Sequence, residues 1–381
     1  MARDIPFKPR FYIDHLQFLK HTGIIGAFDS NINDNIQVVD NTGANLFTNN
    51  NAMKLFDFNP VNQISLPYSQ YGLQNLNGSE IKVRLNTGLK KATDWEGKWY
   101  IANLGHNLYS ANGGIRANFA NASGQQQGMG GSPTEIINGL FPSSYNGFSI
   151  EEITAKPQDD DFAQWINFCI LNRQENTDLG DVNLGAISFG KIFDLSISSD
   201  MKMSMSYEYG YDSQISRSGS YLSNSKWFQK PTWAGLPAFE LSKQESADTI
   251  GFRKSGKRVY DLSFTYLTSD ETLATSSVLD GTTLEGYLFE GDTSGDLTDK
   301  TADGYTASVH EEKINIMNDH SIYSQITHKL MGFQLPFIFQ PDTRYAKPDG
   351  FMLARVDEKN FQVEQLMPDL WRVKMKIEEI W

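Results

Sequence analysis

The chain has 381 residues and a formal net charge of −13, and 12% of its residues are aromatic. This aromatic content can build a large core, which excludes a disordered chain, and the length suits two domains. The acidic net charge argues against binding to a nucleic-acid backbone, because such binding needs a basic face. It is typical of a soluble surface, and a local basic patch is still compatible with this net charge.

Cys169 is the only cysteine, which excludes an intramolecular disulfide and a structural zinc site of the usual kind. It lies in the apolar run 165–171, which predicts a buried strand with Cys169 as a small core residue. The first residues lack an apolar signal region, and no run of 18 apolar residues occurs. We therefore expect no signal peptide, no membrane span and synthesis in a reducing cytoplasm.

The N-terminal region predicts one strand and one Asn-rich loop. Residues 10–19 follow two prolines and predict a strand, with an extended arm before it at a surface or sheet edge. Ring subunits clasp one another through such arms, but a simple leading segment fits equally well. Residues 31–55 are rich in Asn and predict a loop with a short strand at 36–39.

Residues 55–195 contain many short apolar or alternating segments and no good helix pattern. Turn clusters separate them, and the Gly/Gln-rich stretch 124–131 predicts a surface loop, since no phosphate-binding pattern precedes a helix there. This spacing predicts a β-sandwich. The expected strands lie at 81–85, 98–104, 114–119, 165–171 and 185–189.

One turn in this region is a candidate site. Gly105 follows the strand 98–104 and permits a tight bend, and His106 and Asn107 can hydrogen-bond the backbone that the strand end leaves free. A role in the turn is favoured over a sugar or metal contact, because no other His or carboxylate stands at ligand spacing.

Two segments that follow differ in pattern. Apolar residues alternate with polar ones over 201–209, which predicts a strand face packed on a core or on another subunit; they are Met201, Met203, Met205, Tyr207 and Tyr209. Residues 213–225 are polar and predict a turn. The aromatic, proline-broken stretch 227–237 predicts a covering loop, with a carbohydrate-stacking surface as the alternative.

Residues 256–267 predict a clean strand, and 269–310 predict an acidic insertion. A solvated insertion is favoured over a calcium site at 280–303, because the acidic residues do not match the EF-hand spacing. Residues 319–330 predict a helix, with Ile322, Ile326 and Leu330 on one face. Asp319 or Ser321 can cap it and Gly332 can end it, before a buried strand at 335–339.

The C-terminal segment 370–381 alternates strictly, which predicts a half-buried strand with Trp371, Val373, Met375 and Ile377 on the inner face. We expect it to pair beside strands distant in sequence, such as 201–209 and 257–267. Deletion of the residues after Leu370 should then prevent soluble folding or assembly.

Several of these segments resemble proteins of tailed phages. Residues 99–108 and 113–117 resemble galactose-binding-like jelly rolls of phage tail proteins. Residues 256–267, the predicted helix 319–330, and residues 335–342, 351–357 and 371–381 are similar to minor tail and distal-tail (baseplate hub) proteins. The resemblance implies a mainly β fold. A jelly-roll domain, residues 51–199, would be inserted in a second, barrel-like β-module with one helix, residues 1–50 and 200–381.

The resemblance further implies a non-enzymatic structural subunit of a phage tail or baseplate, without cofactor or metal. Copies would form a homo-oligomeric ring, a hexamer, and contact other tail, baseplate or fibre proteins, with the jelly roll displayed for fibre attachment or host contact. The protein would be assembled in the host cytoplasm and reside in the virion. Its expected assembly residues are Met201, Met203, Met205, Trp371 and Trp381.

Two other functions remain as alternatives. One is a carbohydrate-binding protein for host recognition, in which His106 and Asn107 would contact a host-surface glycan. The other is a glycan-degrading enzyme, which the sequence disfavours because it lacks the serine-elbow, His-Glu-x-x-His, phosphate-loop and Cys-x-x-Cys motifs. Acidic groups at 151–152 and 159–161 are common in solvated loops, and the other five histidines are scattered.

Overall fold

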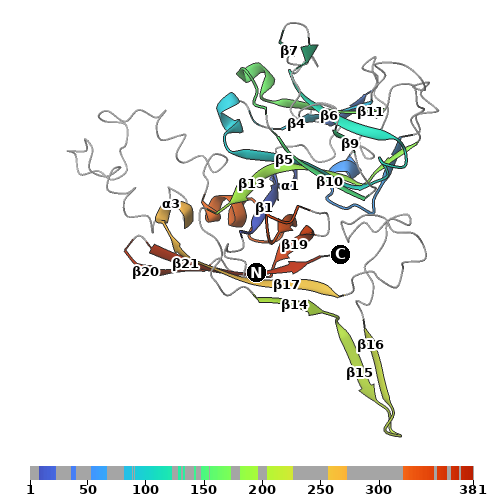
Figure 1. The fold of residues 1–381 in the computed structure, drawn as a ribbon, viewed down its shortest axis with the longest axis vertical. Helices are drawn as coiled ribbons and strands as arrows, with labels where there is room; N and C mark the ends of the chain where they lie inside the picture. The colour runs from blue at the N-terminus through green and yellow to red at the C-terminus, as the bar shows by residue number, and fades with distance from the viewer. Residues whose placement is uncertain are drawn as a thin grey trace.

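The fold is mainly β, as predicted, and every strand pair described is antiparallel (Figure 1). The described strands form open sheets without a closed barrel, so the barrel-like form expected of the second module is not seen in them. The computed structural model describes residues 8–22, 36–39, 53–66, 81–87, 89, 91–121, 128–129, 132–133, 141–142, 147–153, 155–172, 181–195, 204–225, 256–272, 321–346, 350–357, 362–368 and 370–380.

A ten-stranded sheet runs through the whole molecule. Strand β20 (Val363–Met367) lies off its main path and pairs with β21. The other strands follow the order β10 (Gly147–Ile153), β5 (Lys98–His106), β13 (Ala186–Asp194), β1 (Arg10–Asp14), β18 (Phe337–Gln340), β19 (Met352–Val356), β21 (Leu370–Glu379), β17 (Lys257–Leu267) and β14 (Ser204–Glu208).

A five-stranded sheet packs on one part of this sheet. Its order is β2 (Ile36–Val39), β4 (Ile81–Asn86), β11 (Trp165–Asn172), β6 (Gly113–Ala120) and β9 (Phe141–Pro142). Three two-stranded sheets complete the described strands: β3 (Ile64–Leu66) with β12 (Val182–Leu184), β7 (Gly128–Met129) with β8 (Ser132–Pro133), and β15 (Tyr211–Ile215) with β16 (Tyr221–Ser225).

The helical elements in the described residues are short. Two are α-helical, α1 (His15–His21) and α3 (Ser269–Thr272), and one is a π-helical turn, η7 (Tyr323–His328). Three 3-10 turns are η2 (Met53–Phe56), η3 (Ala92–Trp95) and η4 (Asp160–Phe162). None of the helices in the described part of the chain is long and apolar enough to cross a membrane.

The five-stranded sheet and the strands β5 and β13 form a β-sandwich with one shared core. Trp95, Trp99 and Phe189 stack in its centre, with the rings of Trp99 and Phe189 5.2 Å apart. Phe119 of β6 meets Trp95 edge to face at 4.8 Å. Aromatic pairs in such offset and edge-on geometries favour a defined arrangement of the two sheets beyond the area they bury.

Strand β1 lies in the middle of the ten-stranded sheet, where it pairs with β13 on one side and β18 on the other. The predicted strand 10–19 is therefore too long, because β1 ends at Asp14 and α1 begins at His15. The Asp14 carboxylate accepts hydrogen bonds from the backbone N–H groups of Leu16 and Gln17 and so caps the helix. A Cβ on Gly190 would collide with the backbone of this junction, so glycine permits the close approach of β13.

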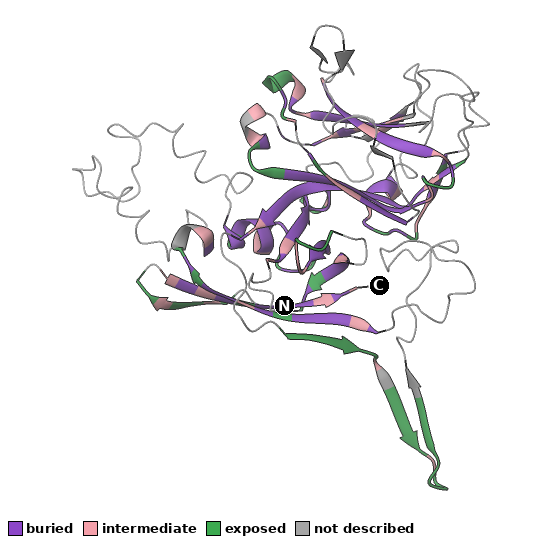
Figure 2. Ribbon diagram, in the orientation of Figure 1, coloured by how far each residue is buried: buried purple, intermediate pink, exposed green. Residues whose placement is uncertain are grey.

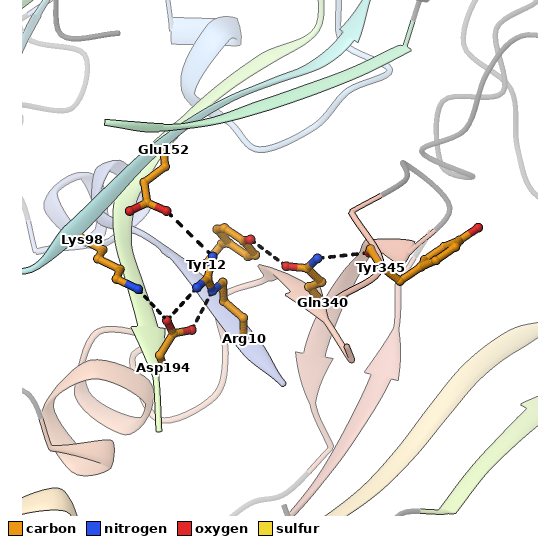
Figure 3. A network of polar contacts seen from close by, with 7 residues as sticks. All are labelled: Arg10, Tyr12, Lys98, Glu152, Asp194, Gln340 and Tyr345. Carbon is orange, nitrogen blue, oxygen red and sulfur yellow. Dashed lines mark hydrogen bonds and ion pairs between the residues drawn. The ribbon is translucent and has the colours of Figure 1, made fainter. Parts of the chain in front are cut away.

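A polar network ties β1 to its neighbours on both sides (Figure 3). Arg10 donates two hydrogen bonds to the carboxylate of Asp194 on β13, at 2.6 and 2.8 Å. Tyr12 donates to Gln340 Oε1 on β18 at 2.8 Å. Burial works to raise the pKa of Asp194, but the hydrogen bonds and charge of Arg10 outweigh it, and the pKa falls below its ordinary value. The same residues thus fix both registers of β1.

The predicted C-terminal strand is confirmed as β21. Trp371, Val373, Met375 and Ile377 are all buried in one core, and the intervening residues are more exposed. Strand β21 pairs with β17, more than a hundred residues earlier in the chain, as expected, and also with β19 and β20.

The predicted helix near residue 322 packs its apolar face into this second core. Ile322, Ile326 and Leu330 are fully buried there, and Ser321 Oγ accepts the N–H of Ser324 at 3.2 Å, as a cap does. The helix is a π-helical turn, and the chain leaves it through Gly332, whose φ is +67°. Asp319, the other proposed cap, lies outside the described residues.

The ten-stranded sheet crosses both predicted domain boundaries. Strands β5, β10 and β13, from residues 51–199, continue through β1 into the C-terminal strands. Strand β2, from residues 1–50, belongs to the five-stranded sheet, and Leu16 and Phe18 of α1 enter the sandwich core. The division into two modules stays a prediction, and any such modules share one continuous sheet.

A buried ion pair fastens the end of β21 to β17. The Glu379 carboxylate accepts from the backbone N–H of Arg258 at 3.0 Å and from its guanidinium at 3.0 and 3.1 Å. Arg258 Nη2 also donates to the carbonyl oxygen of Phe351 at 2.8 Å. Burial alone would lower the pKa of Arg258, but the charge and hydrogen bonds of Glu379 outweigh it and raise the pKa.

We predict that Glu379→Ala lowers the free energy of unfolding by about 3–5 kcal/mol, because it leaves a buried guanidinium without its carboxylate. The matched control is Glu378→Ala, which removes an ion pair with Arg355, whose side chain is 48% exposed, and should cost less than about 1 kcal/mol. Urea unfolding of the three proteins measures both effects. Equal losses in the two variants would contradict the role given to the buried pair.

Candidate functional site

An exposed β-hairpin projects from the body of the molecule (Figure 1). It consists of β15, β16 and the turn between them, and we call residues 211–225 the arm. Gly219, at φ +83°, donates its N–H to the carbonyl oxygen of Ser216 at 2.9 Å and closes the turn. The prediction of a polar turn over 213–225 is therefore corrected: two paired strands flank a short turn, and their Ser-rich sequence hides the strand pattern.

Most described residues of the arm are exposed (Figure 2), and large apolar side chains lie beside its turn. Ile215 is 73% exposed, Leu222 62% and Tyr221 59%. Two-stranded hairpins are at best marginally stable by themselves in water. An isolated hairpin that also exposes such residues is typical of a segment that a partner covers.

Strand β14 leads into the arm and forms one edge of the ten-stranded sheet. Met205 lies opposite Tyr260 of β17, whose ring belongs to the second core, yet Met205 is half exposed. Tyr207 and Tyr209 are exposed to a similar extent. The apolar face of the sheet thus continues past β17 onto β14, where the chain's own core no longer covers it.

The proposed assembly residues fall into three groups. Met205 lies on the exposed β14, whereas Met201, Met203 and Trp381 lie outside the described residues. The prediction of Trp371 as an assembly residue is corrected. Its side chain packs in the chain's own core beside β17, because the alternation of β21 places it on the inner face.

His106 is fully buried at the end of β5. Its Nδ1 accepts the N–H of Leu108 at 3.3 Å, so Nε2 carries the proton and donates to Ser149 Oγ at 2.7 Å. Gly105, at φ +66°, makes the bend before it. Both ring nitrogens therefore serve the turn, as the favoured interpretation expects, and a ligand contact at His106 finds no support in this geometry.

Asn107 holds the same turn against β12. Its side-chain NH2 donates to the carbonyl oxygen of Asp181 at 3.0 Å, and its Oδ1 accepts the N–H of Asn183 at 2.7 Å. Both the NH2 group and the oxygen of the side-chain amide are thus hydrogen-bonded within the protein, as is typical of a turn residue.

The other groups considered from the sequence have structural surroundings. Cys169 is fully buried, as predicted, although it faces away from the sandwich core, toward Asn118. Asp160 accepts the N–H of Ala92, and Glu152 lies 3.9 Å from Arg10. No group of three or more His, Cys, Asp or Glu side chains placed to hold a metal ion occurs in the part of the chain that is described. The acidic stretch 280–303 lies outside it.

One polar feature was not foreseen from the sequence. Four side chains, Gln37, Arg84, Asn167 and Asn118, form a row across the outer face of the five-stranded sheet. Sequence patterns alone miss it because the row exists only once the register of four distant strands is known.

We predict that His106→Gln makes the free energy of unfolding less dependent on pH in acid. Burial lowers the pKa of His106 to about 3, so between about pH 6.5 and pH 3 only the unfolded chain binds this proton. The wild type then loses about 1.4 kcal/mol per pH unit of acidification from this residue, and the variant does not. The control Asn107→Ala removes no titrating group, so its free energy of unfolding should depend on pH as that of the wild type does. Urea unfolding between pH 4 and pH 8 measures this dependence for both variants. An unchanged dependence in His106→Gln would refute the assignment.

Comparison with known proteins places the chain in no established group. No protein-family model and no curated protein matches it. A solved structure of a histidine mutant of the lectin binding domain of Lectinolysin, complexed with Lewis b, is similar over 43% of this chain and 97% of that one. The sequence identity is 13% and the TM-score 0.26, which is too low to assign a shared fold.

Proposed function

We propose that this chain is a structural subunit of a tailed-phage tail or baseplate, and that copies of it assemble into a ring through the arm and the edge strand β14. The observation that supports self-assembly is the exposure of Ile215, Tyr221 and Leu222 on a projecting hairpin. The phage assignment rests on the resemblance of the strands at 256–267, 351–357 and 371–381 to distal-tail and minor tail proteins.

Physical chemistry favours an assembled form. Edge strands such as β14 carry backbone groups that can pair with another chain, and proteins commonly protect such edges. Several side chains at and beyond that edge are also apolar and exposed, among them Met205, Tyr207 and Leu222. A copy that covers the arm would bury these residues and supply the packing that a lone hairpin lacks.

A ring further requires that each copy use two different surfaces, one that reaches out and one that receives. The arm is suited to the first role because it extends beyond the sheet (Figure 1). In the proposed particle the β-sandwich, at the opposite end of the molecule from the arm, would remain available to fibre proteins or to the host surface.

We predict that the double variant Ile215→Asp/Leu222→Asp stays monomeric under conditions in which the wild type forms larger species. Two charges at the arm tip would be buried without partners on association, which costs several kcal/mol. Sedimentation velocity at matched concentrations measures the difference. Circular dichroism should show an unchanged fold, since both positions are exposed in the monomer.

The matched control is Met367→Asp, which places a charge on a side chain that is 63% exposed on β20 and should leave assembly unchanged. A wild type that is monomeric at every concentration and absent from purified virions would overturn the proposal. So would a double variant that assembles as well as the wild type.

A further inference from the structure

The two edges of the ten-stranded sheet differ in how they are protected against a further strand. The β10 edge carries two adjacent carboxylates, Glu151 and Glu152, and its pairing with β5 shifts register between Gly147 and Phe148. Burial, and then the charge of Glu152, raises the pKa of Glu151 above its ordinary value. Charges and irregular pairing on an edge strand oppose the addition of another strand, so the β10 edge is unsuited to join a second chain.

The β14 edge has neither protection. Its pairing with β17 is regular over all five residues, and each of the five is exposed. Among the described strands only β17 pairs with β14, so the other edge of β14 offers backbone N–H and C=O groups to a further strand. Glu208, at the end of the strand, is the single charge in β14. Such an exposed and regular edge is suited to strand addition.

The arm provides two strands that match this edge in length. Strands β14, β15 and β16 have five residues each. Among the described strands β15 and β16 pair only with each other, so each has an outer edge, and the arm extends away from its own β14 (Figure 1). Arg217, in the turn of the arm, is exposed and is the single charge in residues 213–225. A cationic tip on a chain of net charge −13 favours an acidic partner, such as a second copy.

Antiparallel pairing gives two ways to place the arm of one copy on the β14 edge of the next. If β16 joins the edge, its first residue, Tyr221, lies at the Glu208 end of β14, and the turn with Arg217 lies at that end too. If β15 joins instead, the turn lies at the Ser204 end, about 13 Å from Glu208 along the strand. Charge complementarity between Arg217 and Glu208 therefore favours β16.

Pairing over the full length of both strands also matches their apolar side chains. It sets Ser223 opposite Ser206 and Leu222 opposite Tyr207. Tyr207 shares its face of β14 with Met205, which lies opposite Tyr260 of the second core. Because residues directly opposite each other share a face, Leu222 would extend this apolar face and cover part of the exposed Tyr207.

We propose that β16 of one copy adds to the β14 edge of the next copy, so that the ten-stranded sheet continues from copy to copy through the arm. This inference rests on the proposed function and specifies which surface receives the arm. The contact joins two different surfaces of the chain, so it can continue around a ring. A pair of two β14 strands would instead close a dimer after one contact.

Disulfide formation in the full chain tests this pairing. The double variant Ser206→Cys/Ser223→Cys places two thiols at opposite positions of exposed strands, where Cα atoms lie within the roughly 4.4–6.8 Å that a disulfide spans. Cys169 is fully buried and does not compete. On oxidation we expect a ladder of covalent oligomers up to the size of the ring on a non-reducing gel, with roughly tenfold or more cross-linked chain than in either single variant.

Each alternative arrangement has its own matched variant. Ser206 is the middle residue of β14, so Ser206→Cys alone cross-links only if two β14 strands pair with each other. Ser223 is the middle residue of β16, so Ser223→Cys alone cross-links only if two arms pair through β16. Ser206→Cys/Ser213→Cys exceeds both single variants only if β15 joins β14. Cross-linking in any of these that equals that of Ser206→Cys/Ser223→Cys would overturn the proposal.

Charge reversal gives a second measurement of the same contact. Arg217→Glu should weaken assembly roughly two- to fivefold at low salt, because it places a carboxylate beside Glu208. Arg217→Glu/Glu208→Arg should restore assembly, since it exchanges the two charges. Equal weakening in the single and the double variant would show that Arg217 and Glu208 do not meet, which would also contradict the choice of β16.

Sedimentation of the reduced proteins separates this inference from the proposed function. If the wild type and reduced Ser206→Cys/Ser223→Cys are monomeric at every concentration, self-assembly itself is wrong. If both assemble but oxidation gives no ladder, self-assembly stands and the pairing of β16 with β14 is wrong.

Discussion

The fold depends on the pairing of β1 with strands from two distant parts of the chain. Arg10 meets Asp194 at a sequence separation of 184 residues, and Tyr12 meets Gln340 at a separation of 328. Without β1, the strands of the sandwich would lose their hydrogen-bonded connection to the C-terminal strands. The charged pair on one side and the Tyr–Gln bond on the other specify the register, and a shift by one residue would exchange the buried faces.

Sequence patterns were most informative where one face of a strand is buried. The alternation of β17 and β21 predicted both strands and their inner faces, including Val373 and Ile377. In Arg10–His21 both the strand and the helix are largely buried, so periodicity could not separate them, although Asp14 before the helix is a capping residue. The arm was missed because its strands are rich in Ser and exposed on both faces.

The candidate sites differ in how far sequence could reveal them. The turn at Gly105 to Asn107 is local, so its role follows from three consecutive residues, and the structure gives His106 and Asn107 that role. To predict that Met205 is exposed, one must know what covers β14. To predict that Trp371 is buried, one must know that β21 pairs with β17. The row from Gln37 to Asn118 depends on the alignment of four strands, which no single segment encodes.

The central position of β1 also has a consequence for synthesis on the ribosome. Strand β18 emerges about 328 residues after Tyr12, a delay of roughly 16–65 s at ~5–20 residues per second. Throughout this interval one edge of β1 is open, and the side chain of Phe11 lacks its later neighbours Phe337 and Phe339. The nascent chain therefore exposes an open edge of an apolar strand for most of translation, and its yield in the cell should depend on chaperones that bind such segments until the sheet closes around them.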